Sequence, residues 1–357
     1  MNIALDATPL TVPSGGVRRY TEQLSVALAE TFPDDFFWLL SDQPFDAPKS
    51  VAPNLKTGRP PASMLDRRWW LWGLQREITR LKIRVFHGTD FAVPYLPVCG
   101  SVMTLHDLSP WMDPNWHCES DRVRHRTPIL LRLGLAGMVI TPSEAVRKQA
   151  IEHFGLQASR VVAIPHAAAA SFHPTASDTM MPPYLLYIGT IEPRKNVPML
   201  IDAWREFHRE HPIDLVIAGR RREDAAEIEP EPGLRILGLT SEEELPALIS
   251  RARAVVYPSY YEGFGLPVLE AMQCGAAVIA SSDPAIAEVA GGAAILVDAH
   301  DRRAWVETLR AVSSNGEMLN DLRAKALRRA AEFTWTKTAQ RTREVYEQAR
   351  KRFGHDT

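Results

Sequence analysis

Short apolar runs rich in β-branched residues alternate with helical patterns along nearly all of this 357-residue chain. Repeated strand–helix alternation predicts an α/β protein, with parallel sheets covered by helices on both faces. The predicted strands are Ile3–Asp6, Phe37–Leu40, Val85–His87, Ser101–Leu105, Gly137–Ile140, Val161–Ile164, Tyr184–Ile188, Leu215–Ala218, Leu234–Leu237, Ala254–Tyr257, Ala277–Ala280 and Ala294–Val297. The predicted helices are Val17–Thr31, Arg67–Arg80, Asp121–Leu135, Ser143–Phe154, Val197–His208, Glu242–Ser250, Pro267–Cys274, Ala285–Val289 and a last one over Thr336–Arg352.

The chain is too long for one ordinary hydrophobic core, and its length fits two domains. The segment Phe172–Pro183 has turn composition and no periodicity, so we expect it to link two doubly wound domains. We place the first domain at residues 1–172, the second at 183–334, and a closing helix at 335–357. Ligands of open α/β sheets bind beyond the carboxyl ends of the strands, so two facing domains would bind across a cleft.

Composition narrows the class of protein. Hydrophobic content of 45% and charged content of 24% are those of a soluble globular chain, and a net charge of −2 gives no case for a nucleic-acid partner. Cys99, Cys118 and Cys274 are too few and too scattered for a disulfide framework or a zinc site. The first residues do not resemble a signal peptide, and no apolar run is long enough to span a membrane. We therefore expect a cytoplasmic location.

Two carboxylates, Glu262 and Glu270, lie eight positions apart across a glycine-containing turn. The strand before the turn and Pro267 after it predict a strand–loop–helix unit, because proline is favoured at the first helical position. The loop Gly263-Phe264-Gly265-Leu266 would then direct backbone N–H groups at an anion. With Glu262 on the loop and Glu270 one turn into the helix, both carboxylates could accept hydrogen bonds from hydroxyl groups. A phosphate flanked by such carboxylates fits a nucleotide-sugar.

A second loop, Gly189–Asn196, places Arg194 and Lys195 just before a predicted helix, with Asn196 as a plausible N-cap. Cations at a helix start oppose the helix dipole, which prefers anions there. A local rule broken without visible compensation often marks a functional site. We interpret the two cations as a diphosphate-binding pair, against the alternative of a solvated basic turn.

Two loops of the first half complete the set. His106 follows a buried strand and could donate a hydrogen bond to a sugar hydroxyl or to a leaving phosphate, although a core histidine is the alternative. His87 ends a neighbouring strand and could line the same cleft. Gly15 and Gly16 precede the first helix and would permit close approach of a phosphate or sugar, or form an ordinary turn. No Asp-x-Asp triplet occurs, so we expect neither a metal nor any other cofactor.

With these loops in place, the sequence resembles the GT-B glycosyltransferases, in particular the retaining family 4. Glu262 to Glu270 fits the family's E-x7-E pattern, and Gly189–Asn196 fits its phosphate loop. Further similarity comes from Thr104–Asp107, from Asp6 followed by Gly15-Gly16 and Arg19-Tyr20, and from Phe333–Trp335. The resemblance implies two Rossmann-like domains facing across a cleft, an acceptor side in the first, a donor side in the second, and a last helix that crosses back to the first.

The resemblance also implies residue roles. Arg194 and Lys195 would bind the donor diphosphate, and Glu262 with the loop 263–266 would hold the donor sugar and phosphate. Glu270 would hold the ribose, His106 would contact the transferred sugar, and Gly16 would let its loop approach the donor. Pro165–Ala170 and Arg18 depart from the family pattern, which affects acceptor-side details only. The implied reaction is hexosyl transfer with retention, through front-face attack, with the cations in place of a metal.

The sequence indicates the identities of the donor and the acceptor less clearly than it indicates the fold. The Thr104–Leu108 loop is similar to those of bacterial mannosyltransferases of surface-polysaccharide assembly, which favours GDP-mannose and a saccharide or lipid-linked acceptor. Cations and tryptophans mix over 64–74 and cations precede an apolar stretch from 121, so either segment could contact a membrane surface or simply pack on the sheet. An epimerase, hydrolase or phosphorylase of the same fold, and a non-catalytic sugar-nucleotide-binding module, stay open, as does the oligomeric state.

Overall fold

The structure is a computed structural model that describes residues 1–50, 52–64, 66–116, 120–175 and 183–355. The chain divides into two compact units. Unit 1 comprises Met1–Trp111, Glu119–His166 and Thr334–Thr357, and unit 2 comprises Met112–Cys118 and Ala167–Phe333. Each unit has its own hydrophobic core and is described by itself below.

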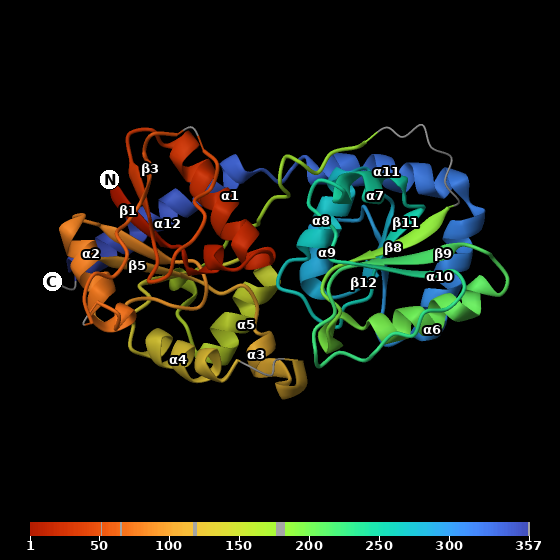
Figure 1. The fold of residues 1–357 in the computed structure, drawn as a ribbon, viewed down its shortest axis with the longest axis horizontal. Helices are drawn as coiled ribbons and strands as arrows, with labels where there is room; N and C mark the ends of the chain where they lie inside the picture. The colour runs from red at the N-terminus through yellow and green to blue at the C-terminus, as the bar shows by residue number, and fades with distance from the viewer. Residues whose placement is uncertain (51, 65, 117–119, 176–182, 356–357) are drawn as a thin grey trace. The chain divides into compact units, whose positions relative to one another are not determined.

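The described part of unit 1 contains one fully parallel sheet with the strand order β3-β2-β1-β4-β5-β6-β7. Its strands are β1 Asn2–Asp6, β2 Phe36–Leu40, β3 Leu55–Thr57, β4 Val85–Gly88, β5 Gly100–Thr104, β6 Met138–Thr141 and β7 Val161–Ala163. Its helices are α1 Gly16–Thr31, α2 Leu74–Arg80, α3 Ser109–Met112, α4 Asp121–Arg132, α5 Glu144–Phe154 and α12 Trp335–His355. Helices α1 and α12 cover one face, and α2, α4 and α5 cover the other (Figure 1).

The described part of unit 2 repeats this architecture with the parallel strand order β10-β9-β8-β11-β12-β13. Its strands are β8 Tyr184–Ile188, β9 Asp214–Ala218, β10 Leu234–Gly238, β11 Ala254–Tyr257, β12 Val278–Ser281 and β13 Ile295–Val297. Its helices are α6 Val197–His208, α7 Leu245–Arg251, α8 Leu266–Gln273, α9 Pro284–Ala290, α10 Arg302–Ser314 and α11 Gly316–Ala330. Helices α6 and α10 pack together on one face, and α11 packs on α8 on the other (Figure 1).

In both sheets the strand order reverses at one point, between β1 and β4 in unit 1 and between β8 and β11 in unit 2. Loops that leave two strands on either side of such a switch point diverge and leave a crevice at the carboxyl ends of the strands. In unit 2 these are the loops that carry Arg194 and Lys195 after β8 and Glu262 after β11. The topology therefore brings together two motifs that are far apart in the chain.

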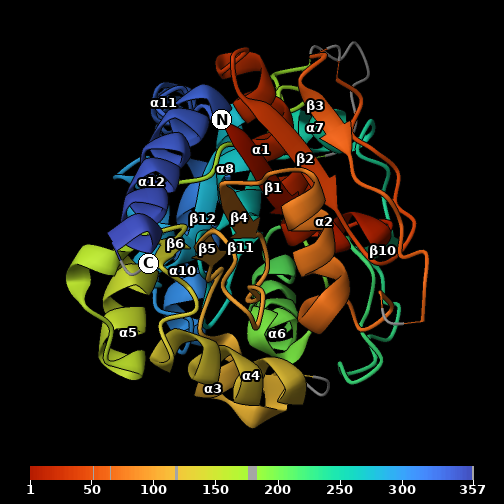
Figure 2. The same cartoon turned by 90° about the vertical axis from the view of Figure 1, so that its left-hand side faces the viewer.

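Helix α12 belongs to unit 1, although it follows the whole of unit 2 in the sequence. It lies beside α1 and crosses β5 (Figures 1 and 2). A Cβ atom at Gly100 would lie 2.9 Å from the carbonyl of Ala349, so only glycine allows the helix this close to the start of β5. The Tyr346 hydroxyl also bonds to Nδ1 of His87 on β4 at 2.7 Å. The expectation that the last helix crosses back to the first domain is confirmed.

The α/β class with parallel sheets is confirmed, and the local differences have physical reasons. Strand β3 was not predicted, because it is a short edge strand whose residues are mostly exposed. Helices α10 and α11 were not predicted either, although Trp305, Val306, Leu309 and Val312 form a buried stripe at helical spacing. The helix predicted over Arg67–Arg80 begins as a π-helical turn over Trp69–Gly73 and becomes α-helical only at Leu74.

The boundary predicted at residue 172 differs from the division after His166. Phe172 is buried in the core of unit 2, and Nε2 of Gln273 donates to the carbonyls of Ala169 and Phe172 at 2.8 and 2.7 Å. These contacts attach residues 167–172 to unit 2. Residues 176–182 of the predicted linker, and Cys118, lie outside the described residues; Cys99 and Cys274 are buried free thiols.

Candidate functional site

The loop after β8 forms a 3-10 turn over Pro193–Lys195 and then passes into α6. Asn196 occupies the N-cap position of α6 with a left-handed backbone (φ 57°), but its side chain does not cap the helix. Its Nδ2 donates to the carbonyls of Ala299 and Pro258 at 2.8 and 3.3 Å instead. The predicted capping role of Asn196 is therefore wrong: its amide holds the loop against neighbouring segments.

Arg194 and Lys195 turn inward and meet Glu262 on the loop after β11. Nζ of Lys195 donates to Oε1 of Glu262 at 2.5 Å and to the Tyr257 hydroxyl at 2.9 Å. Nη1 of Arg194 lies 3.2 Å from Oε2 of the same carboxylate and donates to the Tyr261 carbonyl at 2.7 Å. All three charged side chains are buried. The structure thus rules out both a solvated basic turn and a solvated Glu262.

Two further residues extend this ion-pair network, and no sequence pattern had pointed to their roles. Oε1 of Glu192 accepts from Nη2 of Arg194 at 2.9 Å, and its Oε2 accepts from Nη1 of Arg222, in the loop after β9, at 2.9 Å. Arg222 also donates to the carbonyl of Trp116 at 2.6 Å, and the Trp116 ring stacks on Tyr261 at 6.0 Å. Arg194 is thereby fixed from both sides by carboxylates.

The carboxylates of the network compensate the charges of the two cations that precede the helix, and the sequence did not reveal this pairing. Burial by itself would raise the pKa of Glu262, but Lys195 and Arg194 outweigh burial and lower it to about 2. Burial and the neighbouring Arg194 lower the pKa of Lys195, and Glu262 opposes them. Glu262 is therefore an anion that lies between the two cations.

The loop 263–266 leads into α8, where Gly265 is the N-cap residue with φ 89°. A Cβ atom at Gly265 would also lie 3.3 Å from Ile286, so both the backbone and the space require glycine. The Phe264 side chain packs in the core of unit 2 against Phe333, which leaves only its backbone to meet a ligand. Glu270 lies in α8 and is 2% exposed, so it is not an ordinary residue of the helix surface.

Asp283 is a third carboxylate beside this loop. It caps α9 by accepting from the backbone N–H groups of Ala285 and Ile286 at 2.9 and 3.1 Å, and its Oδ2 accepts from the N–H of Glu262 at 3.4 Å. Burial raises its pKa to about 6, and the nearby Glu262 adds to this effect. In the sequence, the Asp283-Pro284 pair before an apolar run is a helix-start signal that could have identified this residue.

His106, Gly15 and Gly16 belong to unit 1. Nε2 of His106 bonds to the carbonyl of Thr89 at 2.7 Å. A carbonyl only accepts, so Nε2 carries the proton, and Nδ1 is an acceptor in the neutral ring. The half-buried ring can thus accept a hydrogen bond from a sugar hydroxyl at Nδ1, whereas the sequence analysis expected His106 to donate one.

His87 is a core residue, and the expectation that it lines a ligand cleft is wrong. It is fully buried, with Nδ1 bonded to the Tyr346 hydroxyl at 2.7 Å and Nε2 to Oγ1 of Thr104 at 2.8 Å. Oγ1 of Thr104 bonds in turn to the Tyr20 hydroxyl at 2.9 Å. Burial lowers the pKa of His87 to about 3, so the ring is neutral.

Gly15 and Gly16 are exposed at the start of α1, and an added Cβ atom would meet nothing within 4 Å at either position. Gly15 has φ 136° and is the N-cap residue, so its backbone favours glycine. Gly16 is the first helical residue and has room for a side chain, so its suggested role in close approach depends on a ligand and not on the fold.

The chain matches two families of known proteins. Residues 14–170 match the family "Glycosyltransferase Family 4", and residues 172–329 match "Glycosyl transferases group 1". The chain is 32% identical to O-antigen chain mannosyltransferase B of Escherichia coli over 284 residues, which cover 73% of this chain and 74% of that protein.

Solved structures share the fold. Sucrose-phosphate synthase from Thermosynechococcus elongatus superposes with a TM-score of 0.75 at 20% identity, covering 97% of this chain and 98% of the other. The Anabaena protein HepE in complex with UDP and glucose gives a TM-score of 0.70 at 16% identity, covering 96% and 98%.

Two parallel doubly wound sheets, a returning last helix and these matches define a glycosyltransferase of the GT-B class. The chain belongs to glycosyltransferase family 4.

Proposed function

We propose that the protein transfers a hexose from a nucleotide-diphosphate sugar to a saccharide or lipid-linked acceptor. The observation that carries this proposal is the buried group of Arg194, Lys195 and Glu262 at the switch point of unit 2. A switch point is where ligands of doubly wound sheets bind. The Anabaena neighbour, which shares the fold, is described in complex with UDP and glucose, and this supports a nucleotide-sugar as the donor.

The donor diphosphate would bind to Arg194 and Lys195 by displacing Glu262 from their charges. Each cation about 4 Å from a phosphate charge could contribute on the order of 4 kcal/mol at an effective dielectric constant of 20. The terminus of a helix such as α8 contributes only about 0.3–1 kcal/mol. The cations would therefore dominate, and the released Glu262 carboxylate could accept hydrogen bonds from the sugar. Glu270 would hold the ribose, and the backbone of loop 263–266 the phosphate.

We further propose a front-face reaction with retention that needs no metal. The bond between the sugar's anomeric carbon and the phosphate oxygen breaks, and its electron pair stays on the diphosphate. The acceptor oxygen bonds to the anomeric carbon on the same face and gives its proton to the departing phosphate oxygen. Arg194 and Lys195 would stabilise the charge that develops on the diphosphate. His106 would contact the transferred sugar and accept from a hydroxyl through Nδ1.

For the donor we propose GDP-mannose, and for the pathway the assembly of a bacterial surface polysaccharide or glycolipid. The support is the name of the Escherichia coli relative, an O-antigen chain mannosyltransferase. A thermal-shift panel of nucleotide-diphosphate sugars tests the donor directly. GDP-mannose should give the largest stabilisation, and a larger shift with a UDP-sugar would reject it.

Nucleotide release with and without saccharide acceptors tests the reaction class. Transfer predicts release that depends on the acceptor, and NMR of the product should show the anomeric configuration of the donor. Nucleotide release that does not depend on the acceptor would indicate a hydrolase. An altered sugar that is still attached to its nucleotide would indicate an epimerase. Donor binding without turnover would indicate a non-catalytic module. Activity that EDTA abolishes and Mg²⁺ restores would contradict the metal-independent reaction.

A further inference from the structure

Helix α4 carries two apolar stripes, of which the fold of unit 1 uses only one. Thr127, Leu130 and Leu131 are buried against the rest of unit 1. Ile129 and Leu133 lie on another side and are 57% and 66% exposed. Packing on the sheet therefore explains the first stripe but not the second. A membrane-spanning helix is absent from the described part of the chain.

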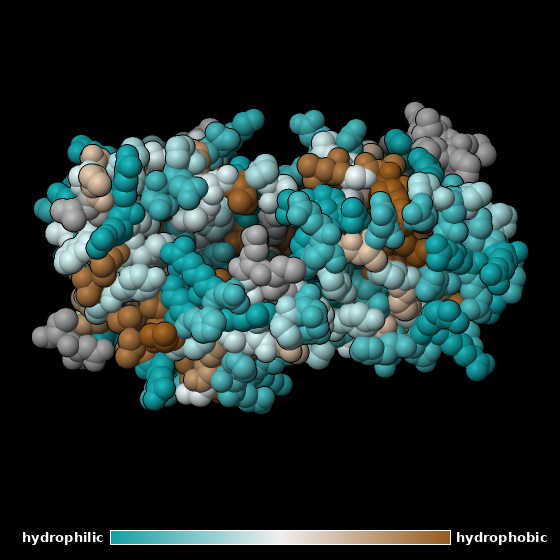
Figure 3. All heavy atoms as spheres, turned by 60° about the horizontal axis from the view of Figure 1, so that its bottom comes forward, coloured by the Kyte–Doolittle hydropathy of each residue, from teal (hydrophilic) through white to brown (hydrophobic). Residues whose placement is uncertain are grey.

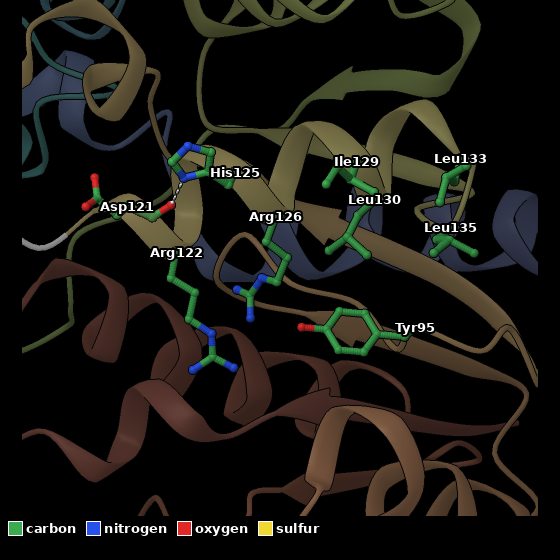
Figure 4. Close-up of a pocket in the computed structure, with 9 residues that line it drawn as sticks. All are labelled: Tyr95, Asp121, Arg122, His125, Arg126, Ile129, Leu130, Leu133 and Leu135. Atoms are coloured by element: carbon green, nitrogen blue, oxygen red, sulfur yellow. Dashed lines mark hydrogen bonds between the residues drawn. The ribbon is translucent and has the colours of Figure 1, made fainter.

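The exposed stripe borders a pocket of about 640 Å³, within the roughly 300–1,000 Å³ of small-molecule sites. Figure 4 shows Ile129, Leu130, Leu133 and Leu135 in a row along α4 and its end, with the Tyr95 ring facing them. Arg122 and Arg126 project from the preceding turns of the same helix (Figure 4). The pocket is thus apolar at one end and cationic at the other. The lining residues are Tyr95, Asp121, Arg122, His125, Arg126, Ile129, Leu130, Leu133 and Leu135.

Its cationic end holds two arginines that form no ion pair in the described part of the chain. Among the residues that the structure describes, neither Arg122 nor Arg126 forms a hydrogen bond or an ion pair, and the buried Nε of Arg126 has no acceptor. Asp121 is 3.6 Å from Arg124 instead. The buried Asp90 is also close enough for Arg126 to oppose the rise that burial causes in its pKa, but the two side chains form no ion pair. The Arg126 guanidinium lies 5.6 Å from the centre of the Trp70 ring, which keeps it beside the pocket.

The adjoining surface of unit 1 has the same mixed character. Trp70 belongs to the π-helical turn, in which Trp72 is 48% exposed, and Arg67 and Arg68 just before it are exposed. The space-filling view shows a group of brown, hydrophobic residues at the lower left, on the surface of unit 1 (Figure 3). The two segments that the sequence marked as basic and aromatic are therefore neighbours, joined by the contact between Arg126 and Trp70.

We propose that this pocket binds an anionic lipid, with one hydrocarbon chain along Ile129, Leu133 and Leu135 and the phosphate at Arg122 and Arg126. A hydrocarbon chain gains free energy by covering exposed apolar surface, and a phosphate would give both arginines the hydrogen-bonded partner that the described residues do not provide. The lipid could be a bilayer phospholipid or a soluble lipid phosphate, since both present a single chain beside a phosphate. Binding here requires no nucleotide-sugar, so it stands apart from the transfer reaction.

Dodecyl phosphate below its micelle concentration is the direct probe, and tryptophan fluorescence of the full chain reports binding. We expect saturable binding that dodecylphosphocholine and inorganic phosphate do not reproduce. Arg122→Ala with Arg126→Ala should weaken binding about tenfold or more, since each cation near a lipid phosphate contributes to attraction. Ile129→Ser with Leu133→Ser should weaken it about as much, and both positions are exposed enough to leave the fold intact.

Leu239→Ser and Arg303→Ala are the matched controls, because both side chains are exposed in unit 2. They should bind dodecyl phosphate as the wild type does. Absence of binding, or equal loss in the controls, would overturn the proposal. A dimer in sedimentation that the Ile129 and Leu133 variant dissociates would also overturn it, because the stripe would then cover a second copy.

Vesicles separate the two sources of the lipid. If the lipid belongs to a bilayer, the protein should co-sediment with vesicles of phosphatidylcholine and phosphatidylglycerol but not with phosphatidylcholine alone, and the same four substitutions should abolish this. Binding of dodecyl phosphate without vesicle binding would identify a monomeric lipid phosphate as the ligand. Vesicle binding that the four substitutions leave unchanged would reject the pocket as the lipid site.

Discussion

The buried polar centres of the two units are built from different chemistry. In unit 2 the centre is ionic, with Arg194 and Lys195 held by Glu192 and Glu262. In unit 1 it is neutral, a hydrogen-bonded chain of Tyr346, His87, Thr104 and Tyr20. Both centres lie at the carboxyl ends of strands beside a switch point, so the fold alone does not explain the difference.

The difference indicates what each centre can do. A buried carboxylate that sits between two cations can be exchanged for a phosphate, because the site is already arranged for negative charge. A neutral chain of hydroxyls and imidazole has no such charge to exchange, and it serves to attach α12 to the sheet. Removing one residue of the polar centre should therefore lower the free energy of unfolding far more in unit 2 than in unit 1, because an unpaired buried charge costs more than an unpaired buried dipole.

The largest effect is expected for Lys195→Ala. Turnover should fall about 10²–10³-fold, as for loss of one group that stabilises developing charge. The free energy of unfolding should also fall by about 3–5 kcal/mol, because Glu262 loses a buried partner. The loss of stability is expected because Lys195 is buried in the network with Glu262. Nucleotide-release kinetics and urea unfolding measure the two quantities.

The double variant Lys195→Ala with Glu262→Gln separates these effects. It removes the buried carboxylate that has lost Lys195, so stability should return toward that of the wild type while turnover stays low. Arg303→Ala, on the surface of α10, is the matched control and should change neither quantity. Turnover that recovers together with stability would show that Lys195 matters only for folding.

In unit 1, His106→Ala should reduce turnover about 10–100-fold, the effect of losing one hydrogen bond to a charged or reacting group. Stability should change by only about 1 kcal/mol, because the ring is half-buried and its hydrogen bond in the described structure is to the Thr89 carbonyl. His153→Ala, at an exposed histidine of α5, is the control. Kinetics as fast as the wild type would remove His106 from the site.

The pH dependence of stability should have opposite sign at two buried carboxylates. Burial raises the pKa of Asp6 to about 6. The stability that protonated Asp6 contributes to the folded state is therefore fully present below the unfolded pKa near 3.8, and it is lost as pH rises through about 6. Asp6→Asn, which keeps the acceptor for Thr8, should therefore stabilise the protein by about 2 kcal/mol at pH 7.5 and much less at pH 4.

The pKa of Glu262 is lowered to about 2. The stability that ionised Glu262 contributes to the folded state is therefore fully present above the unfolded pKa near 4.5, and it is lost as pH falls toward 2. Glu262→Gln should therefore be less stable than the wild type at pH 7, and the difference should shrink on acidification. Urea unfolding between pH 4 and 8 compares the two variants. If the stability difference from the wild type had the same sign for Asp6→Asn and Glu262→Gln, the contrast between a buried carboxylate with cations and one without would be contradicted.

The smallest effect is expected for Tyr346→Phe. The variant removes the hydroxyl bonded to His87 and should lower the free energy of unfolding by about 1 kcal/mol, with turnover unchanged. Guanidinium unfolding and nucleotide release check the two outcomes. A loss as large as that of Lys195→Ala would mean that the neutral centre is as sensitive as the ionic one.

Local structure was largely readable from the sequence, since it depends on nearby residues. Strand β11 and helix α6 lie at the predicted residues 254–257 and 197–208, because periodicity over a few turns or alternations identifies them. The two loops that we propose for the donor were readable too, because Arg194, Lys195 and Glu262 stand where strand–loop–helix patterns place ligand-binding loops. The pairing of Glu192 with Arg222 was not readable, because it follows from β9 lying next to β8.

The two histidines at neighbouring strand ends show most clearly where information from the sequence stops and tertiary structure decides. In the sequence, His87 and His106 both follow apolar runs, and nothing local tells them apart. Tertiary structure decides between them, because Tyr346, 259 residues away, brings α12 over His87 and buries it. The amino acids determined which chemistry was possible at each loop. Only the packing of distant segments decided which polar group keeps access to a ligand, since burial and charge pairing depend on neighbours in space.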